Sequence, residues 1–308
     1  MTVPVALLNG EFIPATELTV PIYDAGFMQG VTVSEQLRTF RGTLFRLDQH
    51  LERLRNSLTV VGLEQEVEIA RLAEWAVELV ARNHAWMEQG DDLGLSLFVT
   101  PGPYPTLAPA GARGPTIGMH TFPIPFHQWV DLYEQGQSLE VSDIRQIPAA
   151  CWPTELKCRS RMHYYLADLQ ARRKDPAARA LLLDSSGYVN EASTANLVVY
   201  RRDEGLVSPP REKILPGVSV AMLQSLAADA NIPFIHREVT VDDVLSADEA
   251  MLSSTSSCLL PVRSLNGQEI GNARPGPVFC DAIERWGDQV GVAIVQQACA
   301  FAKRRILK

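Results

Sequence analysis

The chain has 308 residues, 46% of them hydrophobic, which is enough for two domains with cores of their own. Its formal net charge of −8 disfavours nucleic acid or an anionic membrane surface as a partner. The five cysteines are odd in number and lack C-x-x-C spacing, which argues against a zinc site or a disulfide framework. Without a signal peptide or an apolar run long enough to cross a membrane, we expect a soluble, cytoplasmic protein with no metal site.

Residues 1–125 predict a small α+β domain. Asn9-Gly10 is a strong hairpin signal between two short strands. Asp48 can cap a helix whose apolar residues recur at spacings of three and four, whereas the segment 101–115 is too rich in Pro and Gly for regular structure. The expected elements are strands at 5–8, 11–13, 31–40, 43–46, 93–99 and 116–124 and helices at about 48–61 and 64–88.

Residues 126–308 predict a larger, strand-rich domain, and the proline-containing segment near Pro123–Trp129 marks the boundary. A helix is expected to end near Arg173 and another to follow Gly217. The other expected elements are strands at 139–146, 180–184, 188–191, 197–200, 206–208 and 234–239, a hairpin at 266–267 and one C-terminal helix. The fold class is therefore α+β, with two domains.

Lys157 differs from the other lysines in its surroundings. It is one of five lysines in the chain, none precedes it, and it stands between a proline-marked loop and an apolar helical run. An amine can lose its proton and add to a carbonyl, whereas a guanidinium stays charged. We interpret Lys157 as a candidate for covalent chemistry, with an ordinary, partly buried lysine as the alternative.

Three features of the sequence are suited to an anion. A Pro-Gly pair precedes a helix whose first free N–H groups belong to Val218 and Ser219. Ser253–Ser257 is a run of five hydroxyl residues, and Arg53 can offer a fork of donors from its helix. Each feature also has a plainer interpretation, as a helix start that caps itself, a solvent loop and an exposed arginine.

Glu191 is predicted to point inward, because strand alternation places it on the same face as Val189. A buried carboxylate needs a partner, and either an arginine or a protonated ring nitrogen would serve. Pyridoxal 5′-phosphate requires a lysine for its aldehyde, a cup for its phosphate and a group that faces its pyridine nitrogen. The features described above match that cofactor.

Three blocks resemble the class IV (fold type IV) pyridoxal-phosphate enzymes, which include branched-chain aminotransferases, D-amino acid aminotransferases and aminodeoxychorismate lyases. The blocks are L-L-L-D-S-S-G-Y-V-N-E-A-S-T-A-N-L, I-L-P-G-V-S and A-D-E-A-M-L-S-S-T-S-S-C-L-L-P-V. The resemblance extends over nearly the whole chain. It implies a D-amino acid aminotransferase-like fold, with a small N-terminal α/β domain, a larger C-terminal pseudo-barrel and a homodimeric assembly.

The resemblance also implies roles for individual residues. Lys157 would be the Schiff-base lysine, Glu191 the partner of the ring nitrogen, and Asn196 a structural support. The implied ligands are Arg53, Thr255 and the amides of Val218 and Ser219 on the phosphate, and Leu215 on the ring face. The backbone N–H of Ser256, which follows Thr255, is a candidate for the substrate carboxylate. Arg38, on the hydrophilic face of its strand, is a second candidate, with an interface or surface arginine as the alternative.

Several positions depart from the family patterns. Branched-chain aminotransferases carry a tyrosine five residues after the lysine, where this chain has Met162; Tyr164 and Tyr165 follow it. Arg161 matches an arginine typical of the lyases. The D-amino acid enzymes use a first-domain tyrosine and a V-T-R-G segment, where this chain has Ser34 and V-T-P-G.

We therefore expect transamination of an L-amino acid, with a branched or otherwise apolar side chain, against 2-oxoglutarate. A lyase of the aminodeoxychorismate type is the alternative, because Arg161 and Met162 fit it. A D-amino acid aminotransferase and a non-catalytic scaffold are less favoured.

Overall fold

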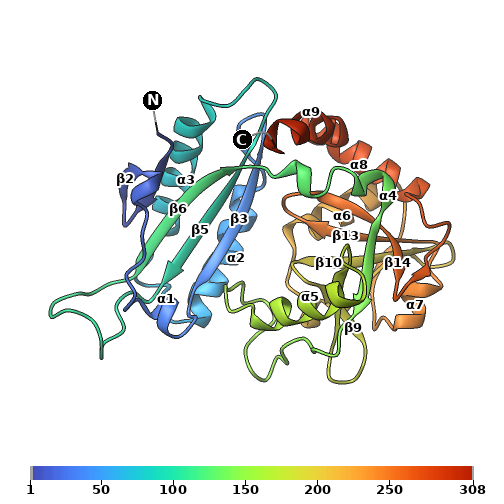
Figure 1. Ribbon diagram of the computed structural model, residues 1–308, viewed down its shortest axis with the longest axis horizontal. Helices are drawn as coiled ribbons and strands as arrows, with labels where there is room; N and C mark the ends of the chain where they lie inside the picture. Colours follow the sequence, from blue (N-terminus) through green and yellow to red (C-terminus); the bar gives the residue numbers. More distant parts are fainter. Residues whose placement is uncertain (1–2, 307–308) are drawn as a thin grey trace. The chain divides into compact units, whose positions relative to one another are not determined.

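The computed structural model describes residues 3–306, which divide into two compact units (Figure 1). Unit 1 holds the described residues up to Ile124 together with Glu155–Ser160. Unit 2 holds Pro125–Thr154 and the described residues from Arg161 onward. Among residues 3–306, no helix is long and apolar enough to span a membrane.

The segment that carries Lys157 belongs to unit 1, whereas the sequence analysis places it in the larger domain. Two backbone hydrogen bonds explain the difference. The Ser34 N–H donates to the Lys157 carbonyl at 2.9 Å, and the Arg159 N–H donates to the Thr32 carbonyl at 2.8 Å. These bonds attach the segment to the start of a unit 1 strand.

In the described part of unit 1, six strands form one antiparallel sheet in the order β2-β1-β6-β5-β3-β4. Asn9 and Gly10 have φ angles of 49° and 90°, as a two-residue hairpin requires, so the predicted hairpin is confirmed. The strands are β1 (Val5–Leu8), β2 (Glu11–Pro14), β3 (Val33–Phe40), β4 (Thr43–Leu44), β5 (Leu93–Thr100) and β6 (Thr116–Pro123). The helices are α1 (Ala25–Met28), α2 (Leu47–Val60) and α3 (Ile69–His84), with a 3-10 helix at Ala15–Glu17.

Helices α2 and α3 cover one face of this sheet and bury its core (Figure 1). The prediction that Asp48 caps α2 is wrong, because Arg46 occupies the cap with a left-handed φ of 49° and Asp48 lies inside the first turn. An acid there still favours the positive end of the helix dipole. Helix α3 begins later than expected, after a turn in which the Glu66 N–H donates to the Leu63 carbonyl at 3.1 Å.

The proline- and glycine-rich loop at 101–115 is fixed at its base. Asp24, which is 1% exposed, accepts hydrogen bonds from the hydroxyls of Thr100 at 2.9 Å and Thr116 at 2.6 Å, one at each end of the loop. Gly102 has a φ of +80°, and a Cβ there would lie 1.9 Å from the Gly114 carbonyl oxygen. Only glycine fits this close approach.

Unit 2 contains a closed barrel. Among its described strands, β10, β13, β14, β7, β8 and β9 are hydrogen-bonded in that order, and β9 pairs back onto β10. The predicted pseudo-barrel is therefore confirmed. Strand β7 runs parallel to both of its neighbours, and the other pairs in the ring are antiparallel. The ring strands are β7 (Gln137–Val141), β8 (Arg179–Leu183), β9 (Val189–Ala192), β10 (Ala195–Arg201), β13 (Glu249–Ser254) and β14 (Cys258–Leu265).

Short strands and helices complete unit 2. Strands β11 (Gly205–Ser208) and β12 (Phe234–His236) extend the sheet beyond β10, and β15 (Gln268–Glu269) extends it beyond β14. The helices are α4 (Leu132–Gln135), α5 (Met162–Lys174), α6 (Val218–Asp229), α7 (Val241–Leu245), α8 (Pro277–Val290) and α9 (Ile294–Ile306), with 3-10 helices at Phe126–Gln128 and Arg211–Lys213.

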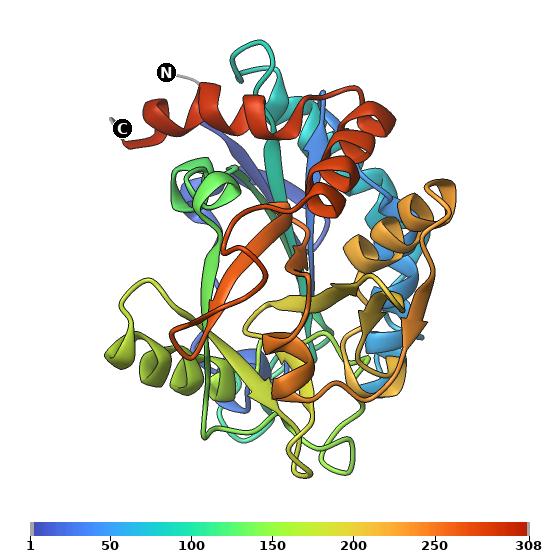
Figure 2. The ribbon, with the colours of Figure 1, turned by 90° about the vertical axis from the view of Figure 1, so that its right-hand side faces the viewer.

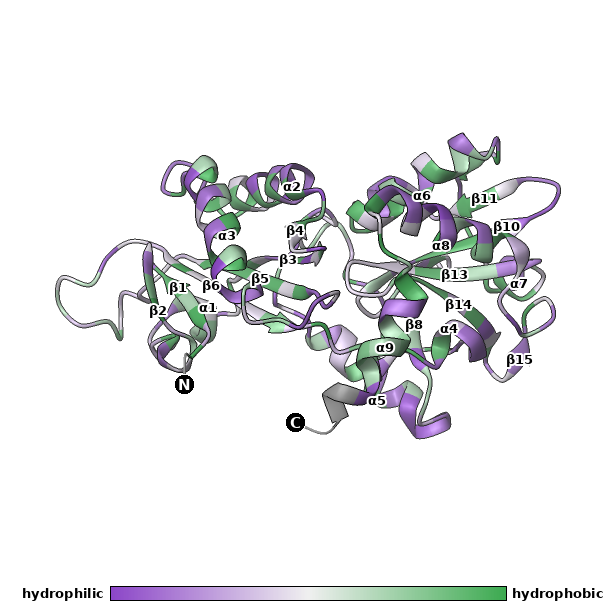
Figure 3. Cartoon of the chain, turned by 90° about the horizontal axis from the view of Figure 1, so that it is seen from above, coloured by the Kyte–Doolittle hydropathy of each residue, from purple (hydrophilic) through white to green (hydrophobic). Residues whose placement is uncertain are grey.

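Apolar strands and covering helices form the core of unit 2. The central strands are largely hydrophobic (Figure 3), and residues such as Val198 and Met251 are fully buried. Helix α8 packs on α6, β13 and β14, and α5 packs on β7 and β8 (Figure 2). The predicted C-terminal helix is two helices, because Gly291 ends α8 with a left-handed φ of 66°.

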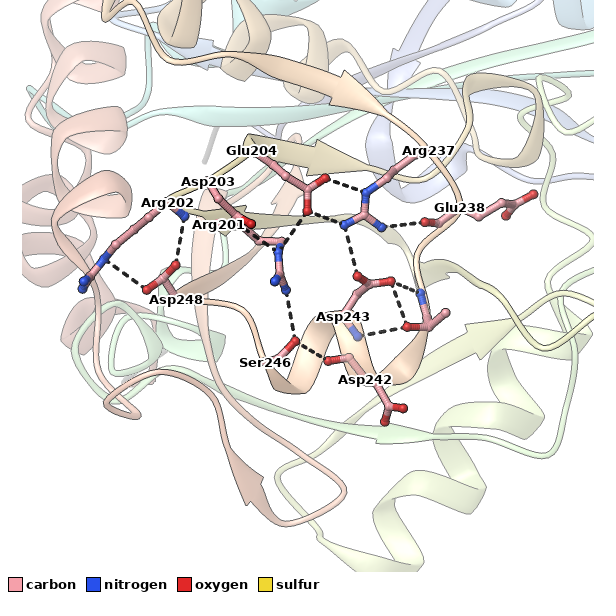
Figure 4. Close-up of polar contacts among 11 residues, drawn as sticks. Arg201, Arg202, Asp203, Glu204, Arg237, Glu238, Asp242, Asp243, Ser246 and Asp248 are labelled. Carbon is pink, nitrogen blue, oxygen red and sulfur yellow. Dashed lines mark hydrogen bonds and ion pairs between the residues drawn. The ribbon is translucent and has the colours of Figure 1, made fainter.

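A charged cluster holds one corner of unit 2 (Figure 4). Arg237 donates to both carboxylate oxygens of Glu204 at 2.8 Å and to Asp243 at 3.1 Å. Asp243 also forms a capping box with Thr240 at the start of α7. Because these charges are paired with one another, we assign the cluster a structural role: it connects the ends of β11 and β12 to the start of α7.

Candidate functional site

Lys157 is held in place by its backbone. Its N–H donates to the Ser57 hydroxyl on α2 at 3.1 Å, and its carbonyl accepts from the Ser34 N–H on β3 at 2.9 Å. The residue is half-buried. A lysine fixed in this way by a strand and a helix presents its amine from a defined point of unit 1.

A buried charge network lies within electrostatic reach of Lys157. His50 is 1% exposed, and its Nδ1 lies 2.7 Å from Glu35 Oε2. Burial lowers the pKa of His50, the bond to Glu35 opposes that shift, and the positive charges of Arg53 and Lys157 lower it further. The neutral form of His50 is therefore favoured over the protonated form.

Arg53, which is implied as a phosphate ligand, is 7% exposed and bound to Glu35 along one edge of its guanidinium. Its Nε donates to Oε1 and its Nη2 to Oε2, each at 2.7 Å. Such a bidentate pair fixes the orientation of the guanidinium plane. The plainer interpretation of Arg53 as an exposed arginine is wrong. Sequence reasoning missed Glu35 and His50, since their partners come from another element.

Glu35 is ionised although it is fully buried. Burial alone would raise its pKa, but the charge and hydrogen bonds of Arg53 and the bond with His50 lower it to about 2. The network therefore keeps a negative charge beside Arg53 at neutral pH.

In unit 2, Glu191 is buried on β9 and surrounded by donors. It is 4% exposed, as the strand alternation predicts. Its Oε1 accepts from Gln146 Nε2 at 2.7 Å and from the Tyr164 hydroxyl at 2.5 Å, and its Oε2 accepts from Asn196 Nδ2 at 3.2 Å and the Leu215 N–H at 3.4 Å. Nothing in the sequence indicated Gln146, which lies 45 residues away.

Asn196 connects Glu191 to the start of α6. It lies opposite Glu191 on β9 and opposite Ser253 on β13, and its Nδ2 also donates to the Leu215 carbonyl at 3.1 Å. A Cβ on Gly217 would lie 2.2 Å from Asn196 Oδ1, so only glycine fits between them. The residue implied as a structural support thus contacts the segment before α6 directly.

The start of α6 is suited to binding an anion. Gly217 occupies the cap and has no side chain with which to satisfy the N–H groups of Val218 and Ser219. Ser219 is 5% exposed. The first N–H groups and the helix dipole favour a negative charge at this end.

The run of hydroxyl residues at 253–257 is an ordered turn rather than a loose solvent loop. The Ser254 and Ser257 hydroxyls lie 2.9 Å apart, and the Tyr133 hydroxyl donates to the Ser257 carbonyl at 2.7 Å. Thr255 and Ser256 are half-buried at its tip. Because Ser253 lies opposite Asn196, this turn follows β13 at the end of the sheet where α6 begins.

Arg38 lies in unit 1 and is not a surface arginine. It is 1% exposed, its guanidinium carbon is 4.1 Å from the centroid of the Phe40 ring, and its Nε donates to the Thr39 carbonyl at 3.3 Å. The negative face of an aromatic ring attracts the positive guanidinium in such an arrangement.

The residues present fit pyridoxal 5′-phosphate. Unit 1 offers a fixed lysine. Unit 2 offers a glycine cradle against Asn196, a helix start without a side-chain cap and a buried carboxylate held by donors. Among residues 3–306 there is no group of three or more His, Cys, Asp or Glu side chains that could hold a metal ion.

Comparisons with known proteins agree with this geometry. The family model for amino-transferase class IV matches residues 32–265. A D-alanine aminotransferase of Bacillus licheniformis is 31% identical over 277 residues, covering 88% of this chain and 92% of that protein. A Methanocaldococcus jannaschii protein assigned to the branched-chain-amino-acid aminotransferases is 25% identical over 291 residues, covering 92% and 98%. The solved branched-chain amino acid aminotransferase of Escherichia coli superposes with a TM-score of 0.84 at 23% identity, covering 93% and 94%. The fold type predicted from the sequence is confirmed.

Glu35 should make the free energy of unfolding decrease as the pH is lowered. The Glu35 carboxylate contributes fully to stability above its ordinary pKa of 4.5, and that contribution is lost as the pH falls toward about 2. The difference between these values corresponds to on the order of 3 kcal/mol. His50 acts in the same direction, because its lowered pKa makes the folded state bind fewer protons than the unfolded chain as the pH drops below 6.5.

Urea denaturation of the parent and of Glu35→Gln between pH 7 and pH 3 checks this prediction. At pH 7 the variant should be less stable by roughly 3–5 kcal/mol, because Arg53 loses its buried counter-charge. Below pH 4.5 its stability should fall less steeply than the parent's. Glu74→Gln, at a 64% exposed side chain, is the control. Parallel losses in the parent and Glu35→Gln below pH 4.5 would contradict the account.

Proposed function

Because the chain belongs to the class IV aminotransferases, whose cofactor is pyridoxal 5′-phosphate, we propose that it transfers the amino group of an L-amino acid to 2-oxoglutarate. The proposed donor has a branched or otherwise apolar side chain. The observation that carries the proposal is the clamped, half-buried Lys157, since an amine at a fixed point is what covalent attachment of the cofactor requires.

The preference for an L-amino acid rests on the first-domain residues. The resemblance places Ser34 and Pro101 where D-amino acid aminotransferases carry a tyrosine and an arginine for the substrate carboxylate. Pro101 offers no hydrogen-bond donor, and the adjacent Gly102 is locked against Gly114 at the loop base. Under this proposal the carboxylate binds elsewhere, with Arg38 and the Ser256 amide as its candidate ligands.

When bound, the cofactor supplies a pyridine ring that accepts electron density from the substrate α-carbon. Lys157 Nζ would hold it at rest and then move a proton at the substrate α-carbon. Glu191 would face the ring nitrogen and favour its protonated form, because a buried carboxylate attracts a neighbouring cation strongly. Leu215 would cover the ring face.

The phosphate ligands in this proposal come from groups that favour an anion. The N–H groups of Val218 and Ser219 and the Thr255 hydroxyl would bind phosphate oxygens from unit 2. Arg53 would contribute its charge, with its guanidinium plane set by Glu35.

We also propose that the protein is a cytoplasmic homodimer. Helix α5 exposes an apolar stripe at helical spacing, formed by Met162 (69% exposed), Tyr165 (66%), Leu166 (40%) and Leu169 (40%). A contiguous stripe of this kind is typical of an interaction surface, and a second copy of the chain is its proposed cover.

A Lys157→Ala variant should lose both turnover and the visible absorbance of cofactor joined to the protein, because the substitution removes the amine held at that point. Absorbance spectra after addition of pyridoxal phosphate, together with steady-state rates, measure both. Lys174→Ala, at a 57% exposed lysine, should behave as the parent does. A Lys157→Ala protein that kept the absorbance band and the turnover would contradict the proposal.

A Glu191→Gln variant should stay folded and bind the cofactor, yet react slowly. The amide is nearly isosteric but does not favour a protonated ring nitrogen, and electrostatic contributions of this kind are worth roughly 10²–10³ in rate. Single-turnover measurements with excess substrate check this. Glu212→Gln, at an exposed acid, is the control. A Glu191→Gln rate within a few-fold of the parent's would mean that another group faces the ring nitrogen.

A lyase of the aminodeoxychorismate type is the second candidate function. Arg161, which matches the lyase pattern, is the N-cap of α5, and Met162 is largely exposed instead of supplying an inward tyrosine. Purified, cofactor-loaded protein is incubated with aminodeoxychorismate and, separately, with candidate amino acids, in each case without an oxo acid. An aminotransferase should stop after one equivalent of product per site, and continued turnover with release of pyruvate would favour the lyase.

A further inference from the structure

Tyr164 points inward from α5, unlike two other residues of the first helical turn. Met162 and Tyr165 are 69% and 66% exposed, whereas the Tyr164 hydroxyl lies 2.5 Å from Glu191 Oε1. Gln146 Nε2 donates to the same oxygen at 2.7 Å and to the Tyr164 hydroxyl at 3.3 Å. The three polar groups form a triangle in which each contacts the other two.

We propose that Tyr164, with Gln146, is a positioning residue that fixes the Glu191 carboxylate. The inference rests on the proposed function, in which Glu191 faces the ring nitrogen. The tyrosine stands seven positions after Lys157, two beyond the site of the tyrosine that branched-chain aminotransferases carry. In this chain the Tyr164 hydroxyl donates to the Glu191 carboxylate.

The geometry explains how the contact would act. Two donors converge on Oε1 from different elements, Gln146 from the segment after β7 and Tyr164 from α5, so rotation of the carboxylate would break at least one bond. Both donors are neutral, and hydrogen bonds to the ionised form favour it without cancelling its charge. The two bonds thus hold the carboxylate in one orientation.

The tyrosine remains a donor at working pH. Burial raises its pKa well above the ordinary value of 10, and the Glu191 charge and hydrogen bond raise it further, while the bond from Gln146 and the charge of Arg161 act against this. His163, whose ring centroid is 4.0 Å from that of Tyr164, is favoured as neutral because burial lowers its pKa. A phenol that keeps its proton can donate to Glu191 continuously.

The test compares two adjacent tyrosines. Tyr164→Phe removes one hydroxyl at the triangle, and Tyr165→Phe makes the same chemical change at an exposed position of the same helix. Pyridoxal phosphate is titrated into each apo-protein and the dissociation constant is measured by fluorescence quenching. We expect a rise of about tenfold for Tyr164→Phe, as the loss of a hydrogen bond to a charged group predicts, and none for Tyr165→Phe.

The same substitution in a Glu191→Gln background isolates the route by which Tyr164 acts. If Tyr164 works through the carboxylate, Tyr164→Phe should change the dissociation constant less than twofold there. Equal effects in the two backgrounds, or no effect in the parent, would overturn the inference. A parent-like single-turnover rate in Glu191→Gln would instead overturn the assignment of Glu191 on which the inference rests.

A second measurement needs no cofactor. The ionisation of Tyr164 in the apo-protein is taken as the difference in tyrosinate absorbance between the parent and Tyr164→Phe during a pH titration. The same difference is then taken between Glu191→Gln and the double variant that also carries Tyr164→Phe. The ionisation of Tyr164 should occur at lower pH in the Glu191→Gln background, because the neighbouring negative charge is gone. An unchanged ionisation would show that Tyr164 does not sense Glu191 and would overturn the inference.

Discussion

The backbone clamp on Lys157 is the constraint on which the proposed chemistry of this chain depends. Segment 155–160 has little regular structure of its own, and hydrogen bonds to β3 and to Ser57 on α2 place it in unit 1. The residues that hold the clamp border the Glu35 network, which joins the same strand to the same helix. Packing in this region therefore fixes the backbone from which the Lys157 side chain projects.

The two buried carboxylates illustrate different uses of the same group. Glu35 is paired with a guanidinium, and such a pair is rigid and electrically satisfied. Glu191 is held by the side chains of Gln146, Tyr164 and Asn196, which are neutral donors. Neutral donors stabilise an anion without adding an opposite charge, which is compatible with the role proposed for Glu191 beside a protonated ring nitrogen.

The sequence predicted features that depend on local pattern. The Asn9-Gly10 hairpin followed from turn chemistry, the burial of Glu191 from strand alternation, and the attention to Lys157 from its unusual surroundings. Each signal lies within a few residues of the feature it predicts. The closed barrel was inferred from resemblance to a family, since strand order depends on pairings distant in sequence.

Features set by long-range contacts could not be predicted in this way. The bond between Gln146 and Glu191 joins residues 45 apart, and the clamp between Ser57 and Lys157 joins residues 100 apart. The cap of α2 was missed because Arg46 adopts a left-handed conformation that its identity does not favour.

Reductive fixing tests the central claim most directly: the cofactor-loaded protein is treated with borohydride, digested with trypsin and analysed by mass spectrometry. The account predicts a phosphopyridoxyl group on Lys157, in the peptide covering residues 146–159, and its appearance on another lysine instead would contradict the account.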